Sequence, residues 1–271
     1  MKKIHLFWWN EKKIMNKSHE NYGDLLGFYL VSKMTDKKVV FAWPKKRTIF
    51  NFFKPIYLTI GSILHNADKK SIVWGSGLID RSLIIQPAKF LAVRGPITRE
   101  LLIKQGHTVP EVYGDPALLL PKYYNPVGVK KKFKLGIIPH YTDFNKTVEC
   151  IKNNELVKII NLMSDSIEKT TNEILECEFV ISSSLHGVIV SHAYGIPALW
   201  TKFSDNPFGD DMKYDDYFLS VGIQPYKINY SLDQFDKNEV LKLFNDQKQY
   251  SIDSEKLHSL QQSLLNTCPF I

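Results

Sequence analysis

The chain has 271 residues, of which 44% are apolar, and a net charge of +7. This is enough for a real core in one large domain or two small ones. Three cysteines without a C-x-x-C spacing exclude a disulfide framework and a structural zinc site, and no window approaches the roughly 20 apolar residues of a membrane span. Because only a short apolar run follows the basic N-terminus, we expect no signal peptide and a cytoplasmic location.

Apolar runs alternate with helical patterns along the first half, which predicts βαβ units in a mostly parallel sheet. Strands are expected over residues 4–9, 38–42, 71–74, 90–93 and 111–113. Helices are expected over residues 24–34, 49–64 and 96–105. Pro96 suits a first helical position, and Gly106 suits the end of that helix.

A break in the pattern follows at residues 121–128, where two prolines and a glycine precede a lysine cluster. Strands are then expected over residues 133–138, 156–160, 178–182, 198–201 and 225–228. Helices are expected over residues 167–176, 186–194, 214–221, 237–244 and 254–265. We therefore predict two Rossmann-like α/β domains that face a cleft, over residues 1–122 and 133–250, with a C-terminal helix over residues 251–271.

The positive charge favours anionic partners such as phosphorylated substrates or an anionic membrane surface. Aromatic residues are not interleaved with basic ones as a single-strand platform requires, so we expect no nucleic acid. Basic residues 45–47 precede an aromatic-rich run over residues 49–58, which could lie in a bilayer interface. A helix packed on the sheet is the alternative that we favour for this run.

The most informative stretch is the turn that follows the expected strand 178–182. Ser182, Ser183 and Ser184 lead into a helix at Leu185, His186 and Gly187, a sequence that predicts an anion site at a helix N-terminus. The hydroxyl groups are better interpreted as anion ligands than as nucleophiles. His186 is the strongest candidate to move a proton, because imidazole titrates near neutrality.

Polar residues follow other expected strands in the same way. Asn21, Gly23 and Asp24 come after the first strand; Gly23 would let the backbone approach a ligand, and Asp24 is either a helix cap or an acid–base group. Arg94 stands at a strand end and could bind a carboxylate or phosphate with both arms of its guanidinium, with a structural ion pair as the alternative.

Three further residues complete the candidate site. Asp115 either caps the next turn or lines the cleft. His140 follows the first strand of the second half, where it either contacts a ligand or is a partly exposed histidine without a role. Lys213 precedes an expected helix and could reach a phosphate in the cleft, or could be a solvated lysine.

Taken together, these residues resemble the polysaccharide pyruvyl transferase family. The motifs that carry the resemblance occur in the family's order between residues 21 and 222: Asn21-x-Gly23-Asp24, Val93-Arg94-Gly95-Pro96, Gly114-Asp115-Pro116-Ala117, Gly136-Ile137-Ile138-Pro139-His140, Ser184-Leu185-His186-Gly187 and Ala193-x-Gly195-Ile196-Pro197. The family often has an arginine just before Leu-His-Gly, where this chain has Ser184.

The resemblance implies a two-domain arrangement like that of GT-B glycosyltransferases. It also implies transfer of a pyruvyl group from phosphoenolpyruvate to a sugar of a surface polysaccharide or its lipid-linked precursor, which gives a cyclic ketal and phosphate without a metal or other cofactor. Arg94 would hold the donor, His186 would transfer the proton and Lys213 would add positive charge. The alternatives are a glycosyltransferase that uses a nucleotide sugar, and a binding protein without catalytic activity.

Overall fold

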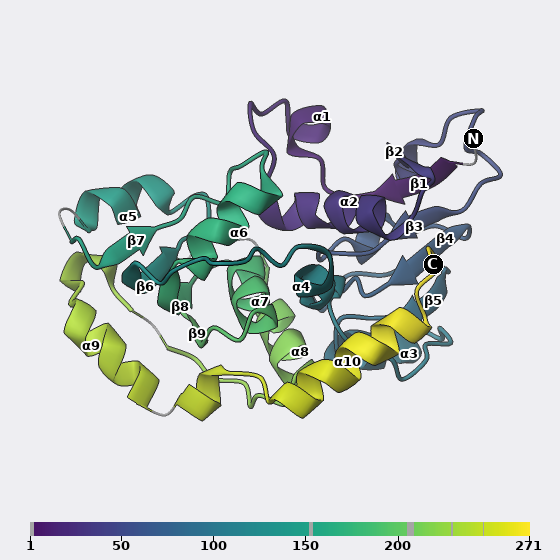
Figure 1. The fold of residues 1–271 in the computed structure, drawn as a ribbon. Helices are drawn as coiled ribbons and strands as arrows, with labels where there is room; N and C mark the ends of the chain where they lie inside the picture. Colours follow the sequence, from purple (N-terminus) through teal and green to yellow (C-terminus); the bar gives the residue numbers. More distant parts are fainter. Residues whose placement is uncertain (1–2, 152–153, 205–208, 229, 246) are drawn as a thin grey trace.

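Two parallel sheets form the frame of the protein in a computed structural model that describes residues 3–151, 154–204, 209–228, 230–245 and 247–271 (Figure 1). Within those residues the first sheet has the order β2-β1-β3-β4-β5 and the second the order β7-β6-β8-β9. The strands of the first sheet are β1 (Lys3–Phe7), β2 (Lys38–Phe41), β3 (Ile56–Leu58), β4 (Ser71–Trp74) and β5 (Lys89–Ala92). Those of the second are β6 (Phe133–Ile138), β7 (Val157–Ile159), β8 (Cys177–Ser182) and β9 (Ala198–Trp200). The predicted Rossmann-like α/β class is consistent with this frame, and the domain boundaries stay predictions.

α-Helices connect all successive strands of the second sheet, whereas in the described first sheet they connect only β1 to β2. Most of the helices lie where the sequence predicts them. They are α1 (Glu11–Met15), α2 (Tyr22–Met34), α3 (Pro96–Lys104), α4 (Leu120–Tyr123), α5 (Phe144–Cys150), α6 (Ile167–Leu175), α7 (Leu185–Ala193), α8 (Met212–Ser220), α9 (Lys237–Lys242) and α10 (Ser254–Asn266). Pro96 does occupy the first position of α3, and Gly106 follows its end with φ of 86°. Among the residues placed, no helix has the length and apolar character needed to cross a bilayer.

The predicted helix over residues 49–64 is wrong. Residues 49–53 form an irregular turn, residues 56–58 are the strand β3, and Leu64–Asn66 make a short 3-10 turn. Pro55 explains the difference, because a proline inside this run cannot continue a helix and favours an extended residue before it. The aromatic run therefore divides into an exposed turn and a buried strand.

Two other predicted strands, over residues 111–113 and 225–228, are not formed in the described part of the chain. Residues 111–113 contribute only a single parallel bridge between Tyr113 and Val93. Residues 225–228 lie beside β9 without joining its ladder. There the Tyr226 hydroxyl accepts from the Trp200 backbone N–H at 2.9 Å, and the Thr201 hydroxyl donates to the Ile228 carbonyl at 2.8 Å, so side chains replace the ladder bonds.

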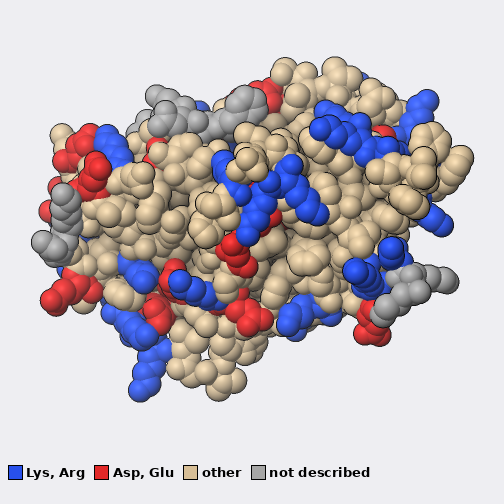
Figure 2. Space-filling model, turned by 90° about the horizontal axis from the view of Figure 1, so that it is seen from above, with Lys and Arg blue, Asp and Glu red and all other residues tan. Residues whose placement is uncertain are grey.

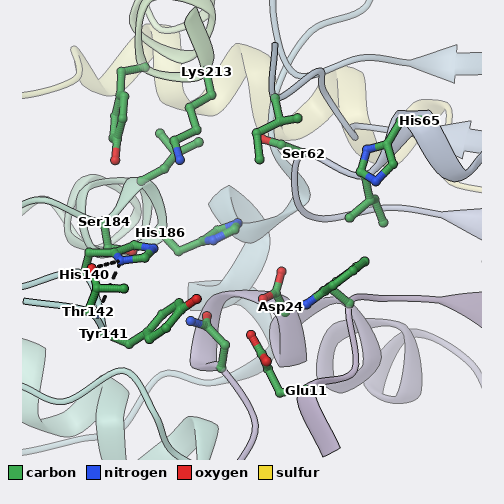
Figure 3. Close-up of a pocket in the computed structure, with 16 residues that line it drawn as sticks. Glu11, Asp24, Ser62, His65, His140, Tyr141, Thr142, Ser184, His186 and Lys213 are labelled. Carbon is green, nitrogen blue, oxygen red and sulfur yellow. Dashed lines mark hydrogen bonds between the residues drawn. The ribbon is translucent and has the colours of Figure 1, made fainter. Parts of the chain in front are cut away.

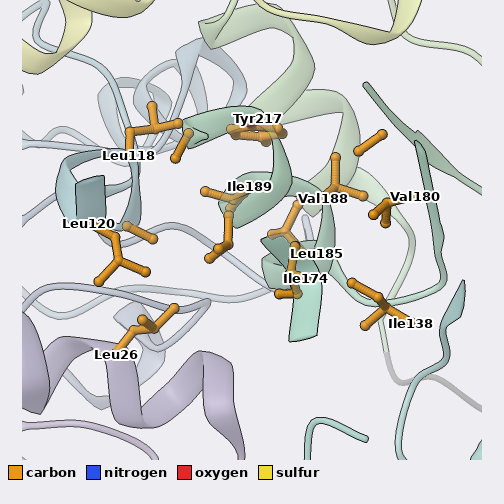
Figure 4. Packing of buried hydrophobic residues seen from close by; sticks show 14 of the residues in the cluster. Leu26, Leu118, Leu120, Ile138, Ile174, Val180, Leu185, Val188, Ile189 and Tyr217 are labelled. Carbon is orange, nitrogen blue, oxygen red and sulfur yellow. The ribbon is translucent and has the colours of Figure 1, made fainter. Parts of the chain in front are cut away.

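Helix α7 lies between the two halves and packs against both. Its buried side chains, such as Val188 and Ile189, belong to one apolar cluster with Leu26 of α2 and Leu118 (Figure 4). Because α7 is apolar on nearly all sides, it is buried nearly all round, and its first turn is fixed relative to the first half. This packing determines where the turn over residues 182–187, which carries His186, meets the first half of the chain.

The C-terminal helix α10 returns to the first half, and the C-terminus lies near its sheet (Figure 1). The Trp74 indole N–H donates to the Leu264 carbonyl at 3.0 Å, and the Gln261 amide donates to the Leu118 carbonyl at 2.8 Å. Phe270 then packs edge-on against Tyr57 and Trp74. The end of the chain thus links the second half back to the first.

Candidate active site

A cavity of about 370 Å³ lies where the carboxyl ends of strands from both sheets face each other. In parallel α/β sheets this edge is the usual place for a ligand. Figure 3 shows His186 and Lys213 reaching in from the second half toward Asp24 and Ser62 of the first. The cavity is lined by Trp9, Glu11, Asn21, Asp24, Ser62, Ile63, His65, Ile79, His140, Tyr141, Thr142, Ser184, Leu185, His186, Lys213 and Tyr214.

The structure separates the predicted site residues into two groups. Those that line the cavity are Asn21, Asp24, His140, Ser184, Leu185, His186 and Lys213. Those that lie behind its wall are Gly23, Arg94, Asp115, Ser182, Ser183 and Gly187. Residues of the second group contact those of the first and hold them in place.

His186 stands in the first turn of α7 with its ring largely buried. Its Nε2 atom lies 3.8 Å from Asp115 Oδ2, and neither of these two buried atoms has a hydrogen-bond partner. Its Nδ1 atom lies against Gly23, where a Cβ atom would come within 2.1 Å of it. Gly23 was expected to admit a ligand, but in this structure it makes room for the imidazole.

Asp115 caps the turn that follows it, as one of its two predicted roles requires. Its Oδ1 accepts from the Ala117 N–H at 2.9 Å, and the side chain is fully buried. The other oxygen is left to face His186. At 3.8 Å the two atoms are too far apart for a hydrogen bond, and a small movement of the ring would bring them within bonding distance.

Asp24 is not the helix cap. Asn21 caps α2 instead, because its side chain accepts from the Gly23 N–H at 3.0 Å. The Asp24 carboxyl is free to face the cavity, where burial raises its pKa to about 7 even though nearby His186 lowers it. A carboxyl that titrates near neutrality is suited to accept and donate protons.

Lys213 enters the cavity from the first turn of α8. Burial and the positive charge of Arg94 lower the pKa of Lys213 to about 8, while Asp211 and Asp24 oppose that shift. The side chain therefore still carries a charge near neutrality, in a place that is poor in water. Such a cation attracts a phosphate or carboxylate strongly.

Arg94 is fully buried and forms the ion pair that was the alternative to donor binding. Its Nε donates to Asp216 at 3.0 Å, and its two terminal nitrogens donate to the Ser62 hydroxyl at 2.6 Å and to the Leu78 carbonyl at 2.7 Å. A Cβ atom at Gly77 would come within 2.4 Å of its guanidinium carbon. Arg94 thus meets the cavity through Ser62, and its direct contact with a donor stays a prediction.

The three serines have different places. The Ser182 hydroxyl contacts the Ile138 and Ser184 carbonyls and accepts from the Ser184 N–H, and the Ser183 hydroxyl accepts from the His140 N–H at 2.7 Å. Both hydroxyl groups hold the turn rather than face the cavity. Ser184 lines the cavity just before α7 and makes no cap bond to the helix, so its hydroxyl can reach a ligand. Gly187 packs closely on Ser182.

His140 lines the cavity as a neutral group. Burial, followed by the charge of Lys213, lowers the pKa of His140 to about 4. Its Nδ1 atom lies 2.8 Å from the Thr142 hydroxyl (Figure 3). It can therefore offer a hydrogen bond to a ligand but carries no charge at neutral pH.

Several residues that line the cavity are not predicted from the sequence. One of them, Glu11, does follow an expected strand. Glu11 begins α1, with three residues between it and the end of β1, so the rule that located the other polar residues applies to it too. Asn10 caps α1 by accepting from the Lys13 N–H at 2.7 Å, and the buried Glu11 pairs with Lys17 at 3.0 Å. Ser62 and His65 had no such signal, because β3 was not predicted.

Across the described ranges, no group of three or more histidine, cysteine, aspartate or glutamate side chains is placed to hold a metal ion. The chemistry that the cavity offers is that of a cation, a helix N-terminus and two groups able to exchange protons.

Comparison with known proteins identifies the family. The family model described as polysaccharide pyruvyl transferase matches residues 7–202. The chain belongs to the polysaccharide pyruvyl transferase family. The match includes the cavity residues from Trp9 to His186 and stops short of Lys213. Family membership supports a transferase that acts on polysaccharide.

This pyruvyl transferase family member is also similar to an uncharacterized protein of Acanthamoeba polyphaga mimivirus. The two are 29% identical over 252 residues, which cover 91% of this chain and 86% of the viral protein. No solved structure matches the chain significantly.

Proposed function

We propose that this protein transfers the pyruvyl group of phosphoenolpyruvate to two hydroxyl groups of one sugar, forming a cyclic ketal and releasing phosphate. The observation that carries the proposal is the cavity in which Lys213 and the first turn of α7 lie beside two proton-exchanging groups, Asp24 and His186. A small donor with a phosphate and a carboxylate needs such cations and dipoles, and its enol ether needs a proton donor.

The anionic ends of the donor would bind at the second half of the cavity. Lys213 supplies the charge, Ser184 supplies a hydroxyl group, and α7 supplies the backbone N–H groups of its first turn. Neutral His140, which lies beside the serine turn in the same half, adds a hydrogen bond. Arg94 positions this set through its bonds to Ser62 and to Asp216 of α8, the helix that carries Lys213.

His186 would give a proton to the methylene carbon of the donor, which becomes a methyl group and leaves a cationic centre at C2. A sugar hydroxyl attacks C2 as Asp24 takes its proton. A second hydroxyl on the same sugar then forms the other C–O bond while the C2–O bond to phosphate breaks, and its proton leaves with the phosphate. The proton held by Asp24 then returns to His186 through solvent. Of the two hydroxyl protons, one thus ends on carbon and one on phosphate, and no oxidant or reductant enters.

The acceptor would be a sugar of a capsule, exopolysaccharide or other surface glycan, held on a lipid-linked precursor in the cytoplasm. The first half supplies an acceptor side with polar groups at Glu11, Asn21 and His65. The two halves would face each other as in GT-B glycosyltransferases, which would let one half bind donor and the other acceptor. The family match and the two-sided lining of the cavity support this part of the proposal.

The test is incubation of the purified chain with phosphoenolpyruvate and candidate sugar or lipid-linked acceptors, with phosphate release and acceptor mass measured together. We expect stoichiometric phosphate and a mass gain of one pyruvyl group. His186→Ala should lower the rate roughly a hundredfold to ten-thousandfold. His19→Ala, a change at an exposed histidine, is the matched control. If the chain turned over a nucleotide sugar, but did not use phosphoenolpyruvate with any acceptor, a glycosyltransferase would replace this proposal.

A further inference from the structure

The turn between residues 48 and 54 places large apolar side chains in water. Ile49, Phe50 and Phe53 are 86%, 82% and 81% exposed, and Phe52 is 51% exposed. Single exposed apolar residues are ordinary, but four within five positions are unusual on the surface of a monomer and are typical of a binding surface. We call residues 48–54 the aromatic loop.

Polar bonds at its base, rather than its apolar side chains, hold the aromatic loop in shape. Arg47 donates to the Asn51 carbonyl at 2.9 Å and to the Lys54 carbonyl at 2.8 Å, and it pairs with Asp68. The Asn51 side chain accepts from the Thr48 N–H at 2.8 Å. The tip is therefore presented in a fixed form, so little conformational entropy is lost when a partner covers it.

Positive charge surrounds the aromatic loop. Residues 45–70 contain one acidic residue, Asp68, which Arg47 and Ser71 already engage. The basic residues of the same segment are Lys45, Lys46, Arg47, Lys54, Lys69 and Lys70. The Lys70 ammonium also lies 4.6 and 4.5 Å from the ring centres of Phe52 and Phe53. In Figure 2 lysine and arginine side chains lie on several sides of the N-terminal half, at the right of the view.

We infer that the aromatic loop docks this protein on the surface of an anionic phospholipid bilayer. Phe50, Phe53 and Ile49 would enter the boundary between head groups and acyl chains, while the surrounding lysines contact lipid phosphates. Exposed aromatics beside a lysine cluster supply the two weak signals that together give stable peripheral binding. A protein surface would have to be both acidic and apolar to match the same pattern, whereas an anionic bilayer has both properties everywhere.

The position of the aromatic loop leaves the cavity open. Lys54 and Lys70 precede β3 and β4, so the loop lies toward the amino ends of these strands. The cavity lies at their carboxyl ends, beyond Leu58 and Trp74. A bilayer bound to the loop therefore would not plug the active site. The inference does not depend on which reaction the cavity performs.

Vesicle co-sedimentation without any substrate tests the inference. The full chain is mixed with vesicles of phosphatidylcholine alone or with about 30% phosphatidylglycerol. We expect binding to the anionic vesicles only, with strong weakening in about 0.5 M salt because the charges are then screened. Phe50→Ser with Phe53→Ser should reduce the bound fraction at least roughly tenfold. Lys45→Gln with Lys46→Gln should weaken binding as well.

The matched control is Ile84→Ser, which changes another exposed apolar side chain and should leave binding unchanged. All these positions are exposed, so the variants should keep the thermal midpoint of the parent chain. Equal binding to neutral and anionic vesicles, no binding to either, or undiminished binding by the Phe50→Ser, Phe53→Ser variant would each overturn the inference. The last result would favour a protein partner for the aromatic loop.

Discussion

His186 has only one ring nitrogen that can serve a ligand. Nε2 is buried opposite Asp115, so Nδ1, which lies beside Gly23 near the start of α2, is the atom left for proton transfer. A carboxylate behind an imidazole fixes its tautomer and stabilises the protonated ring, as in other acid–base pairs. Asp115 is thus a positioning residue that acts through His186.

Asp115→Asn tests this role without removing the cap. The asparagine keeps an oxygen for the Ala117 N–H but loses the charge that faces Nε2. We expect kcat for pyruvyl transfer to fall at least roughly tenfold, while KM for phosphoenolpyruvate and the thermal midpoint change little. Steady-state kinetics with a soluble acceptor gives both constants. An unchanged kcat would show that Asp115 only caps its turn.

Asp24 and Lys213 together predict a bell-shaped pH dependence. The raised pKa of Asp24, about 7, means that the carboxylate needed as a base is lost as pH falls below that value. The lowered pKa of Lys213, about 8, means that the cation needed for the donor is lost as pH rises above it. We expect kcat/KM to be highest between pH 7 and 8 and to fall on both sides.

Two variants separate the limbs of that profile. Lys213→Arg keeps its charge at all accessible pH values, so the alkaline limb should move upward. Asp24→Asn should lower the rate and remove the acid limb. Phosphoenolpyruvate also titrates on the acid side, so an acid limb that persists in Asp24→Asn would assign that limb to the substrate and contradict the role of Asp24 as base.

At the scale of elements, the sequence predicted the regular parts well because their local signals and their packing agree. Helix α7 and strand β8 were recognised from apolar runs bounded by polar turns, and Pro96 located the start of α3. Strand β3 was missed because three buried residues, Ile56 to Leu58, are too few to stand out after the aromatic loop. The exposure of that loop is a tertiary outcome that no local pattern encodes.

The site was predicted only where it follows strand ends. That rule found His186, Asp24 and Lys213, but it could not tell lining residues from residues behind the wall. Arg94 and Ser182 satisfy the same sequence rule as Ser184, yet they turn toward Asp216 and the Ile138 carbonyl. Whether such a residue lines the cavity or lies behind its wall depends on side-chain partners that are distant in the sequence.

Arg94 joins Asp216 of α8 to Ser62 and Leu78 of the first half, so its removal should lower the stability of the fold. With Arg94→Met, Asp216 keeps its bonds from Thr98 but remains as a buried charge without a counterion. We expect the free energy of unfolding to fall by about 3–5 kcal/mol. Arg81→Met, which breaks a partly exposed pair with Asp210, should cost about 0–1 kcal/mol and serves as the control. Equal losses in urea titrations of the two variants would contradict the buried-pair argument.

At the scale of the whole molecule, the cavity is lined by both halves of the chain, which α7 and the returning C-terminus hold together. Neither half carries all the groups of the proposed reaction, since Asp24 belongs to the first and His186 and Lys213 to the second. Two contacts set their spacing: α7 against α2, and α10 against the first sheet. A change far from the cavity should therefore alter catalysis if it loosens either contact.

Leu264→Ala is a change of this kind, because Leu264 lies on α10, away from the cavity. Its side chain is fully buried on α10 and packs on Gly114, directly before Asp115, where a Cβ atom would come within 3.0 Å of it. Leu264→Ala should lower the free energy of unfolding by about 2–5 kcal/mol and leave a cavity behind the Asp115 turn. Because Asp115 then orients His186 less firmly, kcat should also fall in the fraction that stays folded. Leu219→Ala, at an exposed position of α8, should change neither quantity. A destabilised Leu264→Ala protein with full kcat would show that α10 stabilises the first half without influencing the active site.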